Sequence, residues 1–231
     1  MLFFPTTVVD DFFDNPDRVR ELALQQKYDT NRPGIINGLR SKPLTQILPE
    51  LQEEIREKVL SLFYDIDRDS LDTEIRSYFH KNVPYHKGDN MGWIHQDLPT
   101  SIIAGLVYLT PNPDPDSGTS IFKKIGSVDS DTFKKAHDIK KQFYRDAYFT
   151  HEPNTDDVDY LDEFDYWRSK WDACFEETVN IKNVYNRMVL YDSEEYHAPN
   201  KFVEDRLALV FFITSLKSKT TPIDRLRQVH K

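Results

Sequence analysis

The segment His95-Gln96-Asp97 carries two groups that bind metal ions, an imidazole and a carboxylate, with one residue between them. In an extended segment, side chains two positions apart leave the same face of the chain, so His95 and Asp97 can reach one ion. Two ligands leave a site incomplete, and His197, much further along the chain, is the candidate for the third. Two histidines and one carboxylate on one face of an octahedron leave three positions open, which suits non-haem Fe(II) and oxygen chemistry.

Other clusters of reactive residues lack a comparable pattern. His80 and His86 could pair across a loop, but no carboxylate is suitably spaced, and we expect structural roles for both. The acidic run of residues 156–165 lacks the glycine and the ligand spacing of a calcium loop, which predicts a solvated face. Cys174 is the single cysteine, so the chain can form neither an intramolecular disulfide nor a thiolate zinc site.

The elements that must position these residues are predicted to be helices first and antiparallel strands afterwards. Asn15 followed by Pro16 is typical of a helix start. Apolar residues spaced three and four apart predict a second, amphipathic helix over residues 47–64. Short alternating segments separated by turns favour a β-sandwich or barrel. Strands are expected at residues 74–79, 101–110, 119–122, 176–184, 187–191 and 207–214, and further helices at residues 129–147 and 157–173.

The composition predicts a folded, acidic protein. Of 231 residues, 39% are hydrophobic and 30% are charged, and 15 Phe, 12 Tyr and 3 Trp supply a large apolar area for a core. A chain of this length can bury enough surface to exclude disorder for most of its residues. The formal net charge of −9 and the lack of a basic stripe argue against nucleic acid as a partner, since an acidic surface repels phosphate backbones.

No segment of the sequence suits a membrane. The apolar stretch Met1–Val9 is short, has no basic flank and runs into Asp10-Asp11, unlike a signal peptide. No run approaches the roughly 20 apolar residues that a membrane span needs. We expect a soluble cytoplasmic protein with no membrane partner.

Motifs on both sides of His95 resemble those of the 2-oxoglutarate/Fe(II)-dependent oxygenase superfamily and, within it, the prolyl-hydroxylase-like branch. The resemblance covers about residues 74–214. The matching positions are Tyr85 with Gly88, Gly92 to Asp97, Leu106 to Leu109, Gly118 to Phe122, Asn186 to Tyr191, His197 to Pro199 and Arg206. The sequence departs from the pattern of the branch at Ser117-Gly118, where the branch has two glycines.

The resemblance implies a mainly β fold with flanking helices, built on a double-stranded β-helix (jelly roll). It also implies a metal centre with three Fe(II) ligands, namely His95, Asp97 and His197. We expect one oxygenase domain over residues 1–231. Its parts are an N-terminal strand with supporting helices at 1–70, the jelly-roll core at 74–214 and a helical insertion at 126–175. Such an insertion is a candidate lid, because a reactive metal centre must be closed off from its surroundings.

Three further residues match the pocket in which this superfamily binds 2-oxoglutarate. Arg206 matches the basic residue that binds the distal carboxylate, and its position at the start of an apolar strand would place it at a barrel mouth. Tyr85 matches a tyrosine that donates to the same carboxylate, and Tyr108 is a third candidate for lining the pocket. From the residues alone, Arg206 could instead form a surface salt bridge with Glu204 or Asp205, and both tyrosines could be core residues.

The activity that the resemblance implies is that of a 2-oxoglutarate-dependent dioxygenase, a hydroxylase of a peptidyl side chain or a small molecule. Such an enzyme uses Fe(II), O2 and 2-oxoglutarate as co-substrate, and couples decarboxylation of 2-oxoglutarate to C–H oxidation. Two alternatives remain open, a cupin-like metal-binding jelly-roll protein with non-oxidative chemistry and a non-catalytic binding domain. Arg206 separates the oxygenase from the cupin-like protein, because without 2-oxoglutarate it has no reason to point inward, and the intact set of His95, Asp97, His197 and Arg206 argues against a non-catalytic domain. The substrate and the oligomeric state are open.

Overall fold

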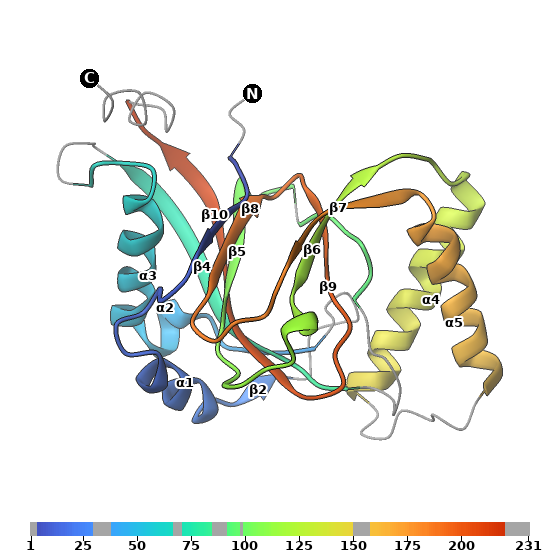
Figure 1. The fold of residues 1–231 in the computed structure, drawn as a ribbon, viewed down its shortest axis with the longest axis horizontal. Helices are drawn as coiled ribbons and strands as arrows, with labels where there is room; N and C mark the ends of the chain where they lie inside the picture. Colours follow the sequence, from blue (N-terminus) through green and yellow to red (C-terminus); the bar gives the residue numbers. More distant parts are fainter. Residues whose placement is uncertain are drawn as a thin grey trace.

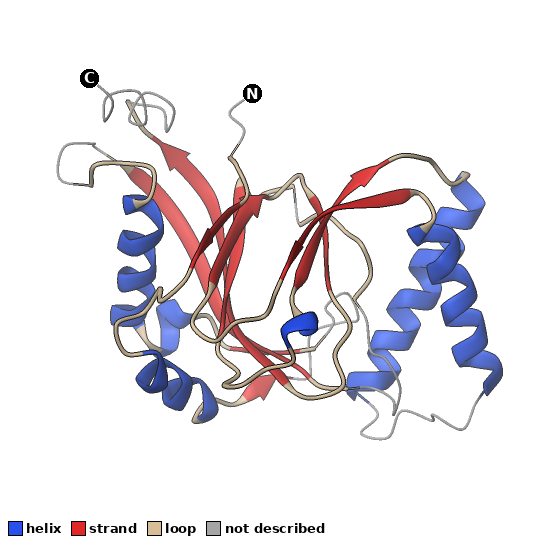
Figure 2. Cartoon of the chain, viewed as in Figure 1, coloured by secondary structure: helices blue, strands red, loops and turns tan. Residues whose placement is uncertain are grey.

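The computed structural model describes residues 4–29, 38–66, 71–84, 92–97, 99–149 and 158–219. Two antiparallel β-sheets form the centre of this part of the chain (Figure 1). The N-terminal helices lie on one side of the sheets and the inserted helices on the other, as the colouring by secondary structure in Figure 2 makes plain. Pro33 and Gly34, which favour a loop after the first helix, lie outside the described residues.

The larger sheet contains the strand that begins at Arg206. Its strands are β1 (Thr7–Val9), β2 (Tyr28–Asp29), β3 (Leu39–Ser41), β4 (Asp72–Asn82), β5 (Ile103–Tyr108), β8 (Met188–Asp192) and β10 (Arg206–Lys217). In the described part of the chain they follow the order β1-β8-β5-β10-β4-β3-β2. β10 pairs with β4 on one side and with β5 on the other, so Arg206 lies on a central strand.

The smaller sheet faces the larger one. Its strands are β6 (Thr119–Lys124), β7 (Phe175–Ile181) and β9 (Tyr196–Pro199), in the order β7-β6-β9. Ile121 and Ile181 of this sheet belong to one buried cluster with Leu106 and Val189 of the larger sheet. The apolar contacts between the sheets make the sandwich interior, and the two facing antiparallel sheets form the predicted jelly roll.

Side chains of the larger sheet alternate between two cores. On β5, Val107 packs under the N-terminal helices, whereas Leu106 faces the smaller sheet. Burial on both faces explains the continuous apolar run at residues 101–110, which the sequence predicts as a central strand. On β10, Leu207 packs toward the helices, so its neighbour Arg206 points into the space between the sheets.

The N-terminal helices cover the outer face of the larger sheet. They are α1 (Pro16–Leu24), α2 (Leu44–Ile47) and α3 (Pro49–Ser61). The Asn15 side chain accepts a hydrogen bond of 3.0 Å from the Arg18 backbone amide, so the predicted helix start is confirmed. Ile55 and Val59 of α3 are completely buried against the sheet, as the predicted amphipathic pattern requires.

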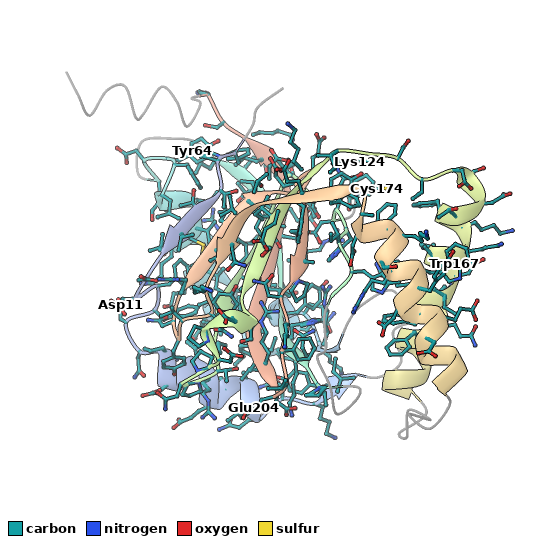
Figure 3. All side chains as sticks on the ribbon, turned by 45° about the vertical axis from the view of Figure 1, so that its right-hand side comes forward. Asp11, Tyr64, Lys124, Trp167, Cys174 and Glu204 are labelled. Carbon is teal, nitrogen blue, oxygen red and sulfur yellow. The ribbon has the colours of Figure 1, made fainter. Side chains whose placement is uncertain are left out.

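The inserted helices, α4 (Ser130–Phe149) and α5 (Val158–Asp172), lie side by side beyond the smaller sheet (Figure 1). The Trp171 indole donates a hydrogen bond of 2.8 Å to the Ile94 carbonyl, which ties α5 to the segment that leads into His95. Figure 3 shows Trp167 on α5, and Cys174 beside the end of β6 where α5 passes into β7. None of the described helices is long and apolar enough to cross a membrane.

The sequence does not predict β2, β3 and β9, which hold two, three and four residues. Strands this short contain too few alternations to show a period. They exist because longer strands beside them supply the hydrogen-bonding edge, as β6 does for β9. The omission matters for function, because β9 contains His197.

Candidate metal centre

His95 and His197 are held opposite each other by their backbones. The amide of His95 donates to the carbonyl of His197 at 3.0 Å, and the amide of His197 donates to the carbonyl of His95 at 2.9 Å. β9 is itself paired with β6, where His197 lies opposite Ile121. This antiparallel bridge places the two imidazole rings on one side, with 4.4 Å between their centroids.

Asp97 completes a three-residue cluster. Its amide donates to the Ser193 carbonyl at 3.3 Å, and its Oδ2 lies 3.6 Å from His197 Nε2. One ligand atom from each of His95, Asp97 and His197 lies within 4.8 Å of the others. Donor atoms that share a transition-metal ion at about 2.1 Å lie roughly 3 Å apart, so a small inward adjustment of the side chains brings this set to bonding distance.

The hydrogen bonds of the two imidazoles leave one nitrogen of each ring ready to bind a metal. His95 Nδ1 lies 2.7 Å from the Trp93 carbonyl, and His197 Nδ1 lies 3.0 Å from the Glu195 carbonyl. Because a carbonyl can only accept, each Nδ1 carries a proton, which leaves Nε2 as the nitrogen of each ring that can bind a metal. Backbone carbonyls commonly orient metal-binding histidines in this way.

The electrostatics of the cluster also favour a metal ion. Burial lowers the pKa of His95 well below its usual value, and the charges of His197 and Lys140 act in the same direction, so the ring is neutral at pH 7. Asp97 Oδ2 is buried and has no hydrogen-bond partner among the described residues. Since an unpartnered buried carboxylate oxygen is costly, a cation that binds to it and to the two imidazoles fits the site.

Arg206 lies inside the sandwich beside two hydroxyl groups. It is only 4% exposed, its Nη2 donates to Thr119 Oγ1 at 3.0 Å, and its guanidinium carbon lies 5.0 Å from the Tyr108 ring centroid. The Tyr108 hydroxyl donates to the same Thr119 oxygen at 2.9 Å. Arg206 Nε is buried without a partner in the described part of the chain. A buried guanidinium with unused donors suits a bidentate anion.

The surface salt bridge that the sequence left open for Arg206 does not form among the described residues. Asp205 instead binds Lys81, with 2.6 Å between its Oδ2 and Lys81 Nζ. The reason is strand alternation: Asp205 lies just before β10 at the surface, whereas Arg206 turns inward. Tyr108 is fully buried but also hydrogen-bonded beside Arg206, and Tyr85 lies outside the described residues.

Tyr191, which the sequence does not single out, lies close to both the metal-ligand cluster and Arg206. Its ring centroid lies 4.5 Å from that of His197. Burial raises the pKa of Tyr191 well above its usual value, and Asp97 and Tyr108 raise this pKa further, whereas Arg206 lowers it. Tyr191 is therefore within electrostatic range of a metal ligand, Asp97, and of Arg206. The available signal is strand alternation, because Tyr191 shares the inward face of β8 with Val189. Thr119 is missed in the same way, as it is seen only as part of a turn motif.

Comparison with known proteins gives a family and a fold. Residues 4–207 match the model of a family described as "Family of unknown function (DUF6445)". No curated protein matches the chain in sequence. HygX from Streptomyces hygroscopicus, with nickel and 2-oxoglutarate bound, is a similar solved structure, with a TM-score of 0.52 and 14% identity over 90% of this chain and 82% of that chain.

Two other solved structures are also similar to this chain. HygX with nickel, 2-oxoglutarate and hygromycin B bound has a TM-score of 0.51 at 12% identity, with 90% of this chain and 82% of that chain covered. A Pseudomonas putida prolyl-4-hydroxylase has 12% identity over 90% of this chain and 91% of that chain, but its TM-score is 0.43, which supports no inference about the branch. The likeness to HygX concerns the fold alone, and it confirms the predicted jelly-roll core.

Proposed function

On the premise that this chain belongs to DUF6445, a family of unknown function, and has the fold of HygX, we propose that it is an Fe(II)- and 2-oxoglutarate-dependent oxygenase that acts as a hydroxylase. The reaction consumes 2-oxoglutarate, O2 and a substrate with a C–H bond, and forms succinate, CO2 and the alcohol. Its substrate is a small molecule or a peptidyl side chain.

One observation carries the proposal: two imidazoles and an unpartnered carboxylate oxygen meet in one cluster. His95, Asp97 and His197 would hold the metal ion. When bound, Fe(II) supplies the redox chemistry that links decarboxylation of 2-oxoglutarate to C–H oxidation. Nickel and 2-oxoglutarate are bound in the HygX structure, which supports the same pair of ligands here.

The protein side chains contribute binding and orientation. Arg206 would bind the distal carboxylate of 2-oxoglutarate through its unused guanidinium donors, and Thr119 and Tyr108 hold the guanidinium in place. Burial of Arg206 removes competing water and strengthens the ion pair. We assign Tyr85 to the same carboxylate on the strength of the sequence resemblance.

The inward position of Arg206 also favours the oxygenase over the two alternatives. A cupin-like protein with non-oxidative chemistry, or a non-catalytic binding domain, has no use for a buried guanidinium with an unpartnered donor. We also propose that residues 1–231 form one oxygenase domain in which the helices of the 126–175 insertion act as a lid. Trp171 on α5 supports this role, because its hydrogen bond to Ile94 brings the insertion to the metal-binding segment.

The test is metal and co-substrate binding by the whole chain without oxygen. Titration with Mn(II), followed by 2-oxoglutarate, is expected to show one tight site for each in the wild type. His197→Ala and Asp97→Ala should each weaken Mn(II) binding by at least about 100-fold, since a three-ligand site loses one of its donors. His137→Ala removes an exposed histidine of α4 and serves as the control.

With Fe(II), O2 and 2-oxoglutarate, the wild type is expected to release succinate slowly even without substrate, and His197→Ala is not. Wild-type protein that binds Mn(II) no better than His197→Ala, or that binds the metal but not 2-oxoglutarate, would contradict the proposed function. A screen of small molecules and peptides for faster succinate release then identifies the substrate.

A further inference from the structure

Lys140 extends from α4 toward the metal-binding segment. Residues three and four apart on a helix share a face, so Lys140 lies on the same face as Ala136 and Phe143. These two side chains are buried in one cluster with Trp93, two residues before His95. The ammonium nitrogen of Lys140 lies 5.9 Å from the Trp93 ring centroid. The insertion therefore brings a cation to the residue whose carbonyl orients His95.

No acidic group of the described residues forms an ion pair with Lys140. Some other lysines of the described chain have carboxylate partners, for example Lys81 with Asp205 and Lys182 with Asp116. Lys140 has none among the described residues, although its side chain is half-buried. Burial lowers the pKa of Lys140 to about 8, so the group is desolvated yet still charged at pH 7. A buried charge without a counter-ion is costly, and a bound anion would remove that cost.

A second cation contributes to the same region. The charges of Lys140 and Arg40 both lower the pKa of His95, and Arg40 also lowers that of Tyr191. Arg40, on β3, donates from Nε to His80 Nδ1 at 3.2 Å on the neighbouring strand β4. Two cations, Lys140 and Arg40, thus act on His95 in a chain whose formal net charge is −9. A metal ion would add further positive charge.

In the proposed function, the other polar residues of the site bind the metal ion or 2-oxoglutarate. Asp97 would bind the metal, and Arg206 with Thr119 would bind the distal carboxylate of 2-oxoglutarate. Lys140 enters from the insertion, beyond the smaller sheet, and has no task in holding either ligand. Its charge is therefore available to the molecule that is oxidised.

We infer that the primary substrate carries an anionic group, a carboxylate or a phosphate, which binds Lys140 beside Trp93. This inference rests on the proposed function and adds to it the chemical class of the substrate. An anionic group at Lys140 would hold the rest of the substrate near the metal ligands, because Trp93 leads directly into His95. Lys140 is then a specificity-determining residue, and Arg40 strengthens the attraction at longer range.

The experiment uses whole protein loaded with Mn(II) and 2-oxoglutarate in the absence of oxygen. The probes are hexanoate, hexyl phosphate and the uncharged hexanamide. Paramagnetic Mn(II) accelerates the proton relaxation of any probe that binds near the metal, so the measurement reports location as well as affinity. The variants are Lys140→Met, which keeps the length without the charge, Lys140→Arg, which keeps the charge, and Lys141→Met, which removes the adjacent exposed lysine as a control.

We expect at least one anionic probe to relax faster than hexanamide in the wild type, in Lys140→Arg and in Lys141→Met. Lys140→Met should weaken its binding at least about fivefold, as expected for loss of a charged hydrogen-bond donor. The tighter-binding of the two probes, hexanoate or hexyl phosphate, shows whether the anion is a carboxylate or a phosphate. The affinity of Lys140→Met for 2-oxoglutarate should equal that of the wild type.

Other outcomes overturn the inference. These are equal relaxation of hexanamide and both anions, anion binding that survives in Lys140→Met, or weaker 2-oxoglutarate binding in that variant, which would assign Lys140 to the co-substrate. Wild-type protein that binds no Mn(II) or no 2-oxoglutarate would instead overturn the proposed function, and the inference with it. The binding of these two ligands therefore separates the two failures.

Discussion

Thr119 and Arg206 are joined by a hydrogen bond of 3.0 Å across the two sheets of the sandwich. Thr119 begins β6 of the smaller sheet and Arg206 begins β10 of the larger sheet. Because Thr119 Oγ1 also accepts from Tyr108, both of its lone pairs are used and its own proton is left to donate. The unused donors of Thr119 and Arg206 are the groups that we propose to bind the distal carboxylate of 2-oxoglutarate.

Arg206→Met is expected to weaken 2-oxoglutarate binding about 100-fold in Mn(II)-loaded protein, because a buried carboxylate loses its charged partner. Calorimetric titration without oxygen measures the change. Arg206→Lys keeps the charge but not the bidentate geometry and should give an intermediate affinity. The metal affinity should stay as in the wild type. Unchanged 2-oxoglutarate affinity in Arg206→Met would remove this residue from the pocket.

Thr119→Val removes the hydroxyl that accepts from Arg206 and Tyr108 while it keeps the shape of the side chain. We expect about a tenfold loss of 2-oxoglutarate affinity and a loss of stability of about 1–2 kcal/mol, since two buried donors lose their acceptor. Thr119→Ser keeps the hydroxyl and should restore most of both. If Thr119→Ser were as impaired as Thr119→Val, the methyl contact rather than the hydroxyl would be responsible.

Gly118→Ala tests the turn that leads into Thr119. A Cβ at Gly118 would overlap the carbonyl oxygen of Ile181 on the neighbouring strand, and a backbone atom cannot move aside easily. We expect a loss of about 3 kcal/mol in the free energy of unfolding, measured in urea, together with weaker 2-oxoglutarate binding. Gly126→Ala is the control, because its Cβ would meet its nearest atom, in Cys174, at 3.5 Å. Equal stability of the two variants would contradict this account of Gly118.

Asp172→Asn tests a buried carboxylate outside the metal centre. Burial raises the pKa of Asp172 to about 6, and the charge of Arg168 only partly opposes this. The unfolded value is near 3.9, so between about pH 4 and pH 6 the folded chain binds more protons and its stability falls as the pH rises. The variant removes the buried charge and should be more stable at pH 7 by roughly 1 kcal/mol, allowing for screening at a side chain one-third exposed.

The stability gain of Asp172→Asn should disappear at pH 4, where the native carboxyl is protonated as well. Urea unfolding at pH 4, 5, 6 and 7 measures the profile. Asp165→Asn, which removes the other and more exposed carboxylate near Arg168, is the control and should show little change at any of these pH values. A constant difference between Asp172→Asn and the wild type across this range would rule out burial of the charge as the cause.

Much of the fold follows from local patterns. The Asn15-Pro16 pair starts a helix because the Asn15 side chain and the Pro16 ring both suit a helix N-terminus, whatever the rest of the fold. The apolar run at 101–110 predicts a strand covered on both sides. Local patterns do not predict the strand β9. Its four residues are extended because β6 offers a partner edge, and the pairing of two distant segments is not encoded in either one alone.

The sequence by itself determined that His95 and Asp97 share a face, because the spacing of two in an extended segment requires it, and motif order singled out His197 and Arg206. Only the tertiary structure decided that His95 lies opposite His197, that Arg206 turns inward to Thr119, and that Lys140 reaches Trp93. The physical reason is that alternation along a strand or helix tells which side chains share a face. Which face points inward, and which distant residue lies opposite, depends on how sheets and helices pack.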